Sequence, residues 1–233
     1  MALEAEIKSE LKNGGVDFVH FVDISHLSGL QNKHFPNAIL FGIAFSPEYI
    51  QKMIPGNPIN KDEFLRKESV VDKLADHIEN YLKQKGYSAY SQSEDNLSLT
   101  GFYDEKTKNT PLPHKAIALL AGLGWIGKNN LLISPDFGSA FCMCTVLTDA
   151  PLKTVLRNPA KPRCRSCSIC KNACSAKAIK GNLWNIDTSR DEMIDISKCD
   201  CCLKCLAFCP WTQSYMQNSP VIMQNIRTES KCK

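Results

Sequence analysis

Apolar residues recur at three- and four-residue intervals from Lys61 to Gln84, which predicts a long amphipathic helix that ends before Gly86. Shorter apolar or alternating runs predict strands, because buried strands are short and helices need more turns. The same criteria predict helices at Glu4–Lys12 and His114–Ala121, and strands at Val16–Val22, Ala38–Phe45, Tyr87–Ser91, Asn130–Ser134 and Ala140–Leu147. Strands interleaved with helices favour a layered α/β domain.

The composition is that of a soluble, folded protein and adds one boundary to this picture. The chain has 233 residues, of which 43% are hydrophobic and 22% charged, so a disordered chain and a small disulfide-stapled protein are both excluded. No apolar run reaches the ~18 residues of a membrane span, and the charged N-terminus differs from a signal peptide, so we expect a cytoplasmic protein without membrane contact. Around residues 151–162 the sequence turns to Pro, Lys and Arg. We therefore predict an α/β core over residues 1–155 and a second, cysteine-rich domain over residues 156–233.

Cysteine is the abnormal component of this chain. Twelve are present, and nine of them lie between Cys164 and Cys209. In a cytoplasmic protein such clustering argues for metal binding rather than disulfides. Eight of the nine repeat one spacing, in which two residues, two residues and then three residues separate successive cysteines. These are Cys164, Cys167, Cys170 and Cys174, followed by Cys199, Cys202, Cys205 and Cys209, with Pro210 after the last.

This spacing is typical of a bacterial ferredoxin that holds two [4Fe-4S] clusters. A loop with a cysteine at every third residue reaches three irons of one cluster, and the fourth cysteine points to the neighbouring cluster. We therefore predict two ligand sets, in which Cys209 completes the first group and Cys174 completes the second. A two-knuckle zinc site is the alternative, but it would leave four cysteines idle. Cys201 is a second candidate for the position given to Cys199.

A glycine segment from Gly122 to Lys128 satisfies the G-x-G-x-x-G pattern and nearly satisfies the P-loop pattern. Both nucleotide-binding motifs need a strand before the glycines and a helix after them. Here the predicted order is reversed, and Asn129 stands where a P-loop has a hydroxyl. A close approach of the backbone to a flat cofactor, or a tight connection between helix and strand, explains the glycines better.

The region from Leu112 to Trp211 resembles epoxyqueuosine reductases. Besides the short runs Leu131-Leu-Ile133 and Pro151-Leu152, the likeness rests on four sequence segments and on the final cysteine group. They are Leu112-Pro-His-Lys115, Ala121-Gly-Leu-Gly-Trp-Ile-Gly-Lys-Asn129, Phe137-Gly-Ser139, Val146-Leu-Thr-Asp149, and Cys202-x2-Cys205-x3-Cys209-Pro-Trp211. The resemblance implies a nitroreductase-like α/β core joined to a two-cluster ferredoxin-like domain. It also implies that the core holds cobalamin, to which the clusters deliver electrons, and that the substrate is a tRNA nucleoside; reductive dehalogenases share this general design.

On this reading the cofactor lies in a cavity of the α/β domain. The residues expected to line it are His114, Lys115, Gly122, Gly124, Trp125, Gly127 and Lys128. Where the family's reductases place a catalytic aspartate, this chain has Lys108-Asn109-Thr110-Pro111, and Asp104 and Glu105 upstream are out of register. The catalytic residues therefore remain unassigned.

Three hypotheses follow for function. The first is a reductase that relays single electrons through two clusters to a cofactor, with a low-potential donor such as a ferredoxin or flavodoxin as its partner. The second is a ferredoxin-like carrier or adaptor without chemistry of its own, which the missing aspartate favours. The third is a zinc-stabilised binding module. Eight basic and no acidic residues between Lys153 and Lys180 suit a docking partner, an RNA, or compensation of the clusters' own negative charge.

Overall fold

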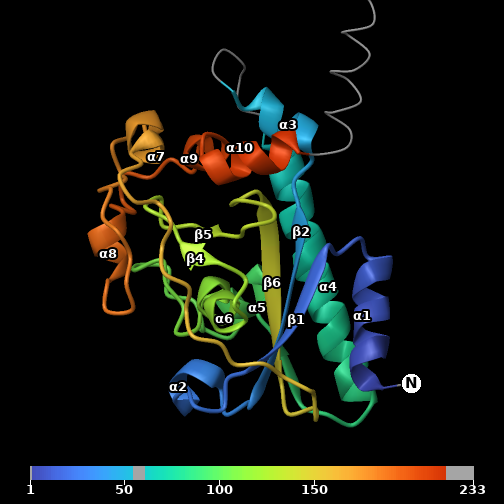
Figure 1. Ribbon diagram of the computed structural model, residues 1–233. Coiled ribbons are helices and arrows are strands. Elements are labelled where there is room, and N and C mark those ends of the chain that lie inside the picture. Colours follow the sequence, from blue (N-terminus) through green and yellow to red (C-terminus); the bar gives the residue numbers. More distant parts are fainter. Residues whose placement is uncertain (1, 55–60, 219–233) are drawn as a thin grey trace, which may run out of the picture. The chain divides into compact units, whose positions relative to one another are not determined.

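The computed structural model describes residues 2–54 and 61–218 (Figure 1). The chain divides into two compact units, and each unit draws on several stretches of sequence. Unit 1 comprises Met1–Ala44, Phe64–Gly122 and Cys142–Asn158, and unit 2 comprises the described parts of Phe45–Glu63, Leu123–Phe141 and Pro159–Lys233. Within the described ranges, no helix has the length and apolar character needed to cross a membrane.

Unit 1 is built on a four-stranded sheet with the strand order β1-β2-β6-β3. The strands are β1 (Phe18–Asp23), β2 (Asn37–Ala44), β6 (Phe141–Thr148) and β3 (Ala89–Ser91). The β1–β2 and β3–β6 pairs are antiparallel, with Phe18 opposite Gly42 and Ala89 opposite Thr148. Seven of the eight residues of β2 are buried, so this strand lies inside the unit.

Helices cover the sheet of unit 1. They are α1 (Leu3–Asn13), α2 (Gly29–Asn32), α4 (Asp62–Gln84), α5 (Glu94–Leu99) and α6 (His114–Leu120). Helices α1 and α4 lie side by side, where Glu6 on α1 receives hydrogen bonds or salt bridges from Tyr81 and Lys85, at or just after the end of α4. Helix α6 packs against β1 and β2, away from α1 and α4 (Figure 1).

Unit 2 consists of short elements. They are α3 (Pro47–Lys52), β4 (Trp125–Ile126), β5 (Leu132–Ile133), α7 (Ile169–Ala173), α8 (Arg190–Met193), α9 (Lys204–Ala207) and α10 (Pro210–Gln217). Strands β4 and β5 form an antiparallel pair in which Trp125 faces Ile133. Helix α7 packs against α9, and α10 packs against α3. Two small clusters of buried residues in this unit pack against cysteines.

The mixed α/β architecture expected from the pattern of apolar residues is confirmed. The last stretch of unit 1 ends at Asn158, and unit 2 also takes in two stretches from earlier in the chain. Helix α3 packs against α10, and Trp125 and Ile133 of the β4–β5 pair form a buried cluster with Cys209, so both segments belong to unit 2.

Candidate metal centre

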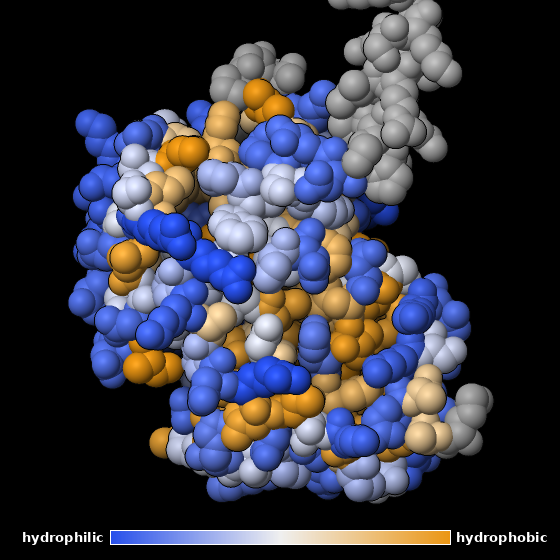
Figure 2. All heavy atoms as spheres, in the orientation of Figure 1, coloured by the Kyte–Doolittle hydropathy of each residue, from blue (hydrophilic) through white to orange (hydrophobic). Residues whose placement is uncertain are grey.

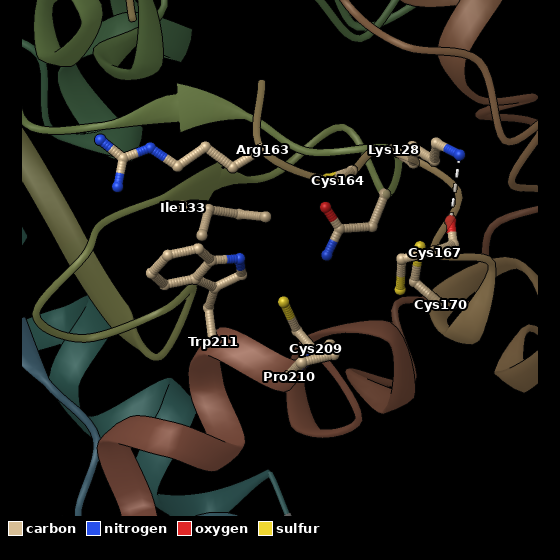
Figure 3. A pocket seen from close by; sticks show the side chains of 10 residues that line it. Lys128, Ile133, Arg163, Cys164, Cys167, Cys170, Cys209, Pro210 and Trp211 are labelled. Atoms are coloured by element: carbon tan, nitrogen blue, oxygen red, sulfur yellow. Dashed lines mark hydrogen bonds between the residues drawn. The ribbon is translucent and has the colours of Figure 1, made fainter. Parts of the chain in front are cut away.

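Four cysteines from two distant stretches line one cavity in unit 2. They are Cys164, Cys167, Cys170 and Cys209, and Figure 3 shows them around the same space. Cys164 and Cys167 lie on a turn closed by a hydrogen bond of 2.8 Å from the Cys167 N–H to the Cys164 carbonyl. Cys170 lies in α7, and Cys209 is the residue that precedes α10. The structure therefore brings together the first predicted ligand set, including the crossover of Cys209.

The cavity has room for much more than a single ion. Its volume is about 160 Å³, whereas one water needs only roughly 10–15 Å³ measured in this way. Among the described residues, no three His, Cys, Asp or Glu side chains converge closely enough to hold a lone metal ion.

The other four predicted ligands gather on a second small core. Cys174, Cys199 and Cys205 pack, together with Cys170, against buried Ala178, Ile179 and Ile194. The Cys174 sulfur accepts a hydrogen bond of 3.3 Å from the Ala178 N–H. Cys202 is close enough to Cys205 for their charges to interact. Cys201, by contrast, is exposed, and its backbone has a positive φ of 51°.

Burial controls the protonation of these thiols. Desolvation raises the pKa of Cys170 to about 11, and repulsion from Cys164, Cys209 and Cys167 adds to this effect. Desolvation likewise raises the pKa of Cys205 to about 12, with contributions from Cys170, Cys202, Cys199 and Cys174. Cys170 thus interacts with the other three members of the first predicted set, and Cys205 with those of the second. Cys205 also interacts with Cys170, so these two thiols lie where the sets meet. Metal coordination requires thiolates, so binding at either set releases protons.

Lys128, the last residue of the glycine segment, and the next residue, Asn129, each donate a hydrogen bond to the main chain of one cysteine group. The Lys128 ammonium donates to the Cys167 carbonyl at 3.0 Å (Figure 3). The Asn129 amide donates to the Cys205 carbonyl at 3.2 Å, and its own oxygen accepts from the Leu131 N–H. Sequence reasoning placed Lys128 at a cofactor in the α/β domain, whereas its side chain lines the cysteine cavity of unit 2. Asn129 was missed as a functional residue, although its place directly after Lys128 was a signal.

Arg163 and Trp211 line the cavity, and Trp125 packs against Trp211. Trp125 packs edge-on against Trp211 with ring centroids 4.9 Å apart, and it also contacts Cys164 and Cys209. The Arg163 guanidinium lies 5.2 Å from the Trp125 ring centre and 5.9 Å from that of Trp211. The indole N–H of Trp125 is buried and has no hydrogen-bond partner within the described residues. Arg163 was missed, although it directly precedes Cys164.

The glycine segment is a tight hairpin rather than a nucleotide loop. Strand β4 lies inside the segment and pairs with β5, and between residues 122 and 141 no helix follows the glycines. A Cβ on Gly124 would stand 1.9 Å from the Ile133 carbonyl oxygen, so only glycine allows this approach of backbone to backbone. The order of elements that argued against a P-loop is thereby confirmed.

The remaining predicted cofactor residues lie in unit 1. His114 begins α6, and its Nδ1 is 2.9 Å from the Thr145 hydroxyl. Burial lowers the pKa of His114 to about 4, so its imidazole is neutral at pH 7. Lys115 follows it, and Gly122 also belongs to this unit. Gly124, Trp125, Gly127 and Lys128 belong to unit 2, so the structure divides the predicted cavity residues between the two units.

A small buried polar group lies next to His114. The Gln92 side-chain amide donates to the Leu112 carbonyl at 2.9 Å, and the Gln92 N–H donates to the Thr145 carbonyl. The Gln92 Oε1 and the Thr110 hydroxyl are buried without partners within the described chain. Sequence reasoning did not identify Gln92, which carries no motif.

The upstream carboxylate candidate has a local structural role. Asp104 accepts hydrogen bonds from the Lys106 and Thr107 N–H groups, at 2.8 and 3.2 Å, and these bonds lower the pKa of its carboxyl. Asp104 is exposed and closes its own turn. It therefore does not replace the aspartate that is missing at residues 108–111.

Comparison with known proteins supports the resemblance. No family model matches the chain. An epoxyqueuosine reductase of Synechococcus sp. (strain RCC307) is 36% identical over 126 residues, which cover 48% of this chain and 38% of that protein. A reductive dehalogenase structure concerned with B12-dependent dehalogenation matches with a TM-score of 0.67 at 20% identity, covering 88% of this chain and 31% of the other.

An epoxyqueuosine reductase with a tRNA-Tyr epoxyqueuosine-modified tRNA stem loop matches with a TM-score of 0.57 at 17% identity, over 91% of this chain and 66% of the other. The expected similarity to epoxyqueuosine reductases is thereby confirmed, and the fold is shared with reductive dehalogenases. The sequence match nevertheless covers well under half of the relative's length.

Proposed function

We propose that this chain is an oxidoreductase that passes single electrons through two [4Fe-4S] clusters to a cobalamin held by the α/β core, in the manner of an epoxyqueuosine reductase. The observation that carries the proposal is the convergence of Cys164, Cys167, Cys170 and Cys209 on one cavity. Cys209 is distant in sequence from the other three, so this convergence is a property of the fold and not of local spacing alone.

The residues around the cavity fit an iron–sulfur cluster. Four cysteine sulfurs supply the ligands, and Ile133, Pro210 and Trp211 give the cavity an apolar lining that shields such a group from water. When bound, such a cluster accepts and releases one electron at a time. Lys128 and Asn129 hold the loops that carry the ligands, and Trp125 and Trp211 exclude water on one side.

For the second cluster we propose Cys174, Cys199, Cys202 and Cys205 as ligands. Cys199 packs against the same buried residues as Cys174 and Cys205, whereas Cys201 is exposed. The charges that act on Cys205 include that of Cys199. These contacts favour Cys199 over Cys201.

For cobalamin we propose the polar group around His114 as part of the binding site. The unpartnered Gln92 Oε1 and Thr110 hydroxyl are acceptors that suit the amide-bearing edge of such a cofactor. The neutral imidazole of His114 and the neighbouring Lys115 would lie with them.

For the electron donor we propose a low-potential protein such as a ferredoxin or flavodoxin. Ile169, Leu183 and Ile186 are 45–73% exposed near the cysteine loops. In Figure 2 scattered apolar side chains stand among hydrophilic ones over α7 and α8. Basic residues of the same stretch, such as Lys171 and Lys177, would attract an acidic partner.

The test is anaerobic purification followed by iron, acid-labile sulfide and corrinoid assays. We expect about eight irons and as many sulfides per chain. Cys209→Ala should lower both to about four, whereas Cys201→Ser, the matched control, should leave them unchanged. Zinc without sulfide would contradict the proposal and support a zinc-stabilised module.

A non-catalytic electron carrier is the second candidate, and residues 108–111 favour it because they lack the aspartate. A titration with cobalamin, monitored by the visible spectrum of the cofactor, distinguishes the reductase from the carrier. Binding that weakens in Gln92→Ala supports the reductase. Full clusters with an unchanged cobalamin spectrum support the carrier.

A further inference from the structure

The cavity lined by the first cysteine set carries an uncompensated positive charge close to its ligands. The Lys128 ammonium lies 3.0 Å from the Cys167 carbonyl, and Lys128 lines the cavity. None of the residues that line this cavity is acidic. Over residues 2–54 and 61–218, no carboxylate forms a salt bridge with Lys128.

The second cysteine set has a different charge environment. The Cys202 N–H donates to the Asp200 carboxylate at 3.2 Å. The charges of Asp200 and Lys204 both reach the Cys202 thiol and act in opposite directions. The charge of Asp200 also reaches Cys199. An acid and a base therefore offset one another beside this set.

We propose that Lys128 raises the reduction potential of the cluster bound by Cys164, Cys167, Cys170 and Cys209, and so makes it the electron acceptor of the pair. This inference rests on the proposed function and deepens it. Reduction adds one negative charge to a cluster, and a cation nearby in a partly buried site stabilises the reduced form. The cluster beside Asp200 lacks this net positive charge and is the donor.

Arg163 provides an internal comparison. It lines the same cavity and bears the same charge as Lys128. Figure 3 shows, however, that its guanidinium extends away from the cysteines, and it lies over the Trp125 and Trp211 rings. Lys128 points toward Cys167 in the same view. Because a Coulomb interaction falls with distance, Lys128 should dominate the potential.

The experiment is a redox titration of the anaerobic full chain, followed by electron paramagnetic resonance, with iron and sulfide measured on each sample. In Lys128→Met we expect the reduced-to-oxidised ratio of one cluster to fall about tenfold at a fixed potential, which is a shift of about 59 mV for a one-electron couple. The other cluster should titrate as before. Lys128→Arg should restore the original potential, and Arg163→Gln should shift it much less.

A second measurement does not depend on the Lys128 variants. Cys209→Ala removes one ligand of the cavity cluster, so the signal of higher potential should disappear and that of lower potential should remain. Loss of the lower-potential signal would overturn the inference, as would an unshifted potential in a fully loaded Lys128→Met protein. Wild-type protein without iron or sulfide would instead contradict the proposed function, so the two failures are distinguishable.

Discussion

The imidazole of His114 is a single group whose protonation differs between the folded and the unfolded chain. Its pKa falls from an ordinary 6.5 to about 4, because burial penalises the charged form. Between these values the unfolded chain binds a proton and the folded chain does not. Stability that depends on His114 is therefore present at pH 7 and is lost as the pH falls from about 6.5 toward 4.

We expect this loss to be measurable. Between pH 7.0 and 5.5 the free energy of unfolding should fall by about 1 kcal/mol more in the wild type than in His114→Gln, which cannot titrate. Urea unfolding under anaerobic conditions at both pH values measures the difference. Equal pH slopes in the two proteins would show that the imidazole does not become protonated on unfolding.

The contribution of Glu68 to stability depends on pH in the opposite direction from that of His114. Burial, together with the charges of Glu94 and Asp72, raises its pKa to about 7. The unfolded chain loses this proton from about pH 4.5 upward, so the cost to stability grows as the pH rises toward 7.

Glu68→Gln should therefore stabilise the protein at pH 8 by about 1 kcal/mol, a value reduced for the partial exposure of the side chain. Exposed Glu105→Gln is the control and should leave stability unchanged within about 0.5 kcal/mol. Chemical unfolding of both variants and of the wild type, at pH 8 and at pH 5, measures these changes in the free energy of unfolding. A stabilisation that is larger at pH 5 would contradict this account.

Position 138 requires glycine for two reasons, its backbone conformation and a close contact. Its φ is +59°, and an added Cβ would lie 2.3 Å from the Thr212 nitrogen. Gly101 has a similar φ of +66° but nothing within 4 Å. Gly138→Ala should cost about 2–4 kcal/mol and Gly101→Ala about 1 kcal/mol. Thermal unfolding of the two variants measures this difference, and equal losses would show that the contact with Thr212 relaxes freely.

At the scale of elements, periodicity found the long helix and the buried strands. The predicted helix Lys61–Gln84 is observed as Asp62–Gln84, and the predicted strand Ala38–Phe45 as Asn37–Ala44. Helices α3 and α5 were missed because six residues are too few to show a helical period. Ser46 and Pro47 nevertheless form a start signal for α3, in which the Ser46 hydroxyl accepts from the Tyr49 N–H.

The candidate site was predictable to the extent that it rests on spacing. The repeated cysteine spacing gave the grouping of Cys209 with the first set, because that grouping follows from the reach of a loop. The supporting contacts of Asn129 and Arg163 depend on tertiary packing between distant stretches, which no local pattern encodes.

A buried threonine of helix α10, Thr212, binds the loop between β5 and β6. The Thr212 hydroxyl accepts from the Ser139 N–H at 3.1 Å, and both residues are buried. Thr212→Val should leave this N–H unpaired and cost about 1–3 kcal/mol. Because Cys209 precedes α10, iron content should fall as well.

Ser139→Ala is the matched control for Thr212→Val. It removes only the contact of 3.3 Å between the two hydroxyls and keeps the backbone donor. Ser139→Ala should destabilise the protein less than Thr212→Val, as measured by thermal unfolding, and should lower the iron content less. A Thr212→Val protein as stable as Ser139→Ala would show that the backbone bond contributes little.

At the scale of the whole molecule, the two units depend on different sources of stability. Unit 1 has a four-stranded sheet and long helices with many fully buried aliphatic side chains. Unit 2 has short elements, and two of its small clusters of buried residues pack against cysteines. Sequence alone could not show that residues 123–141 belong to unit 2, because their apolar pattern is the same as that of unit 1.

Removal of metal should therefore affect the units unequally. After iron chelation under anaerobic conditions, amide exchange should accelerate across residues 159–218 and 123–141, because the proposed clusters would couple metal binding to folding there. Exchange in β2 and α4 should change little. Hydrogen exchange read by mass spectrometry gives both values, and uniform acceleration along the chain would contradict this division.

Lys128 and Asn129 are joined by a single peptide bond, yet each side chain binds the main chain of a different cysteine loop. For the two proposed clusters, a thermal displacement of one loop is thereby transmitted to the other. Together with the packing of α7 against α9, this dipeptide would help to keep constant the distance that an electron crosses between the two clusters.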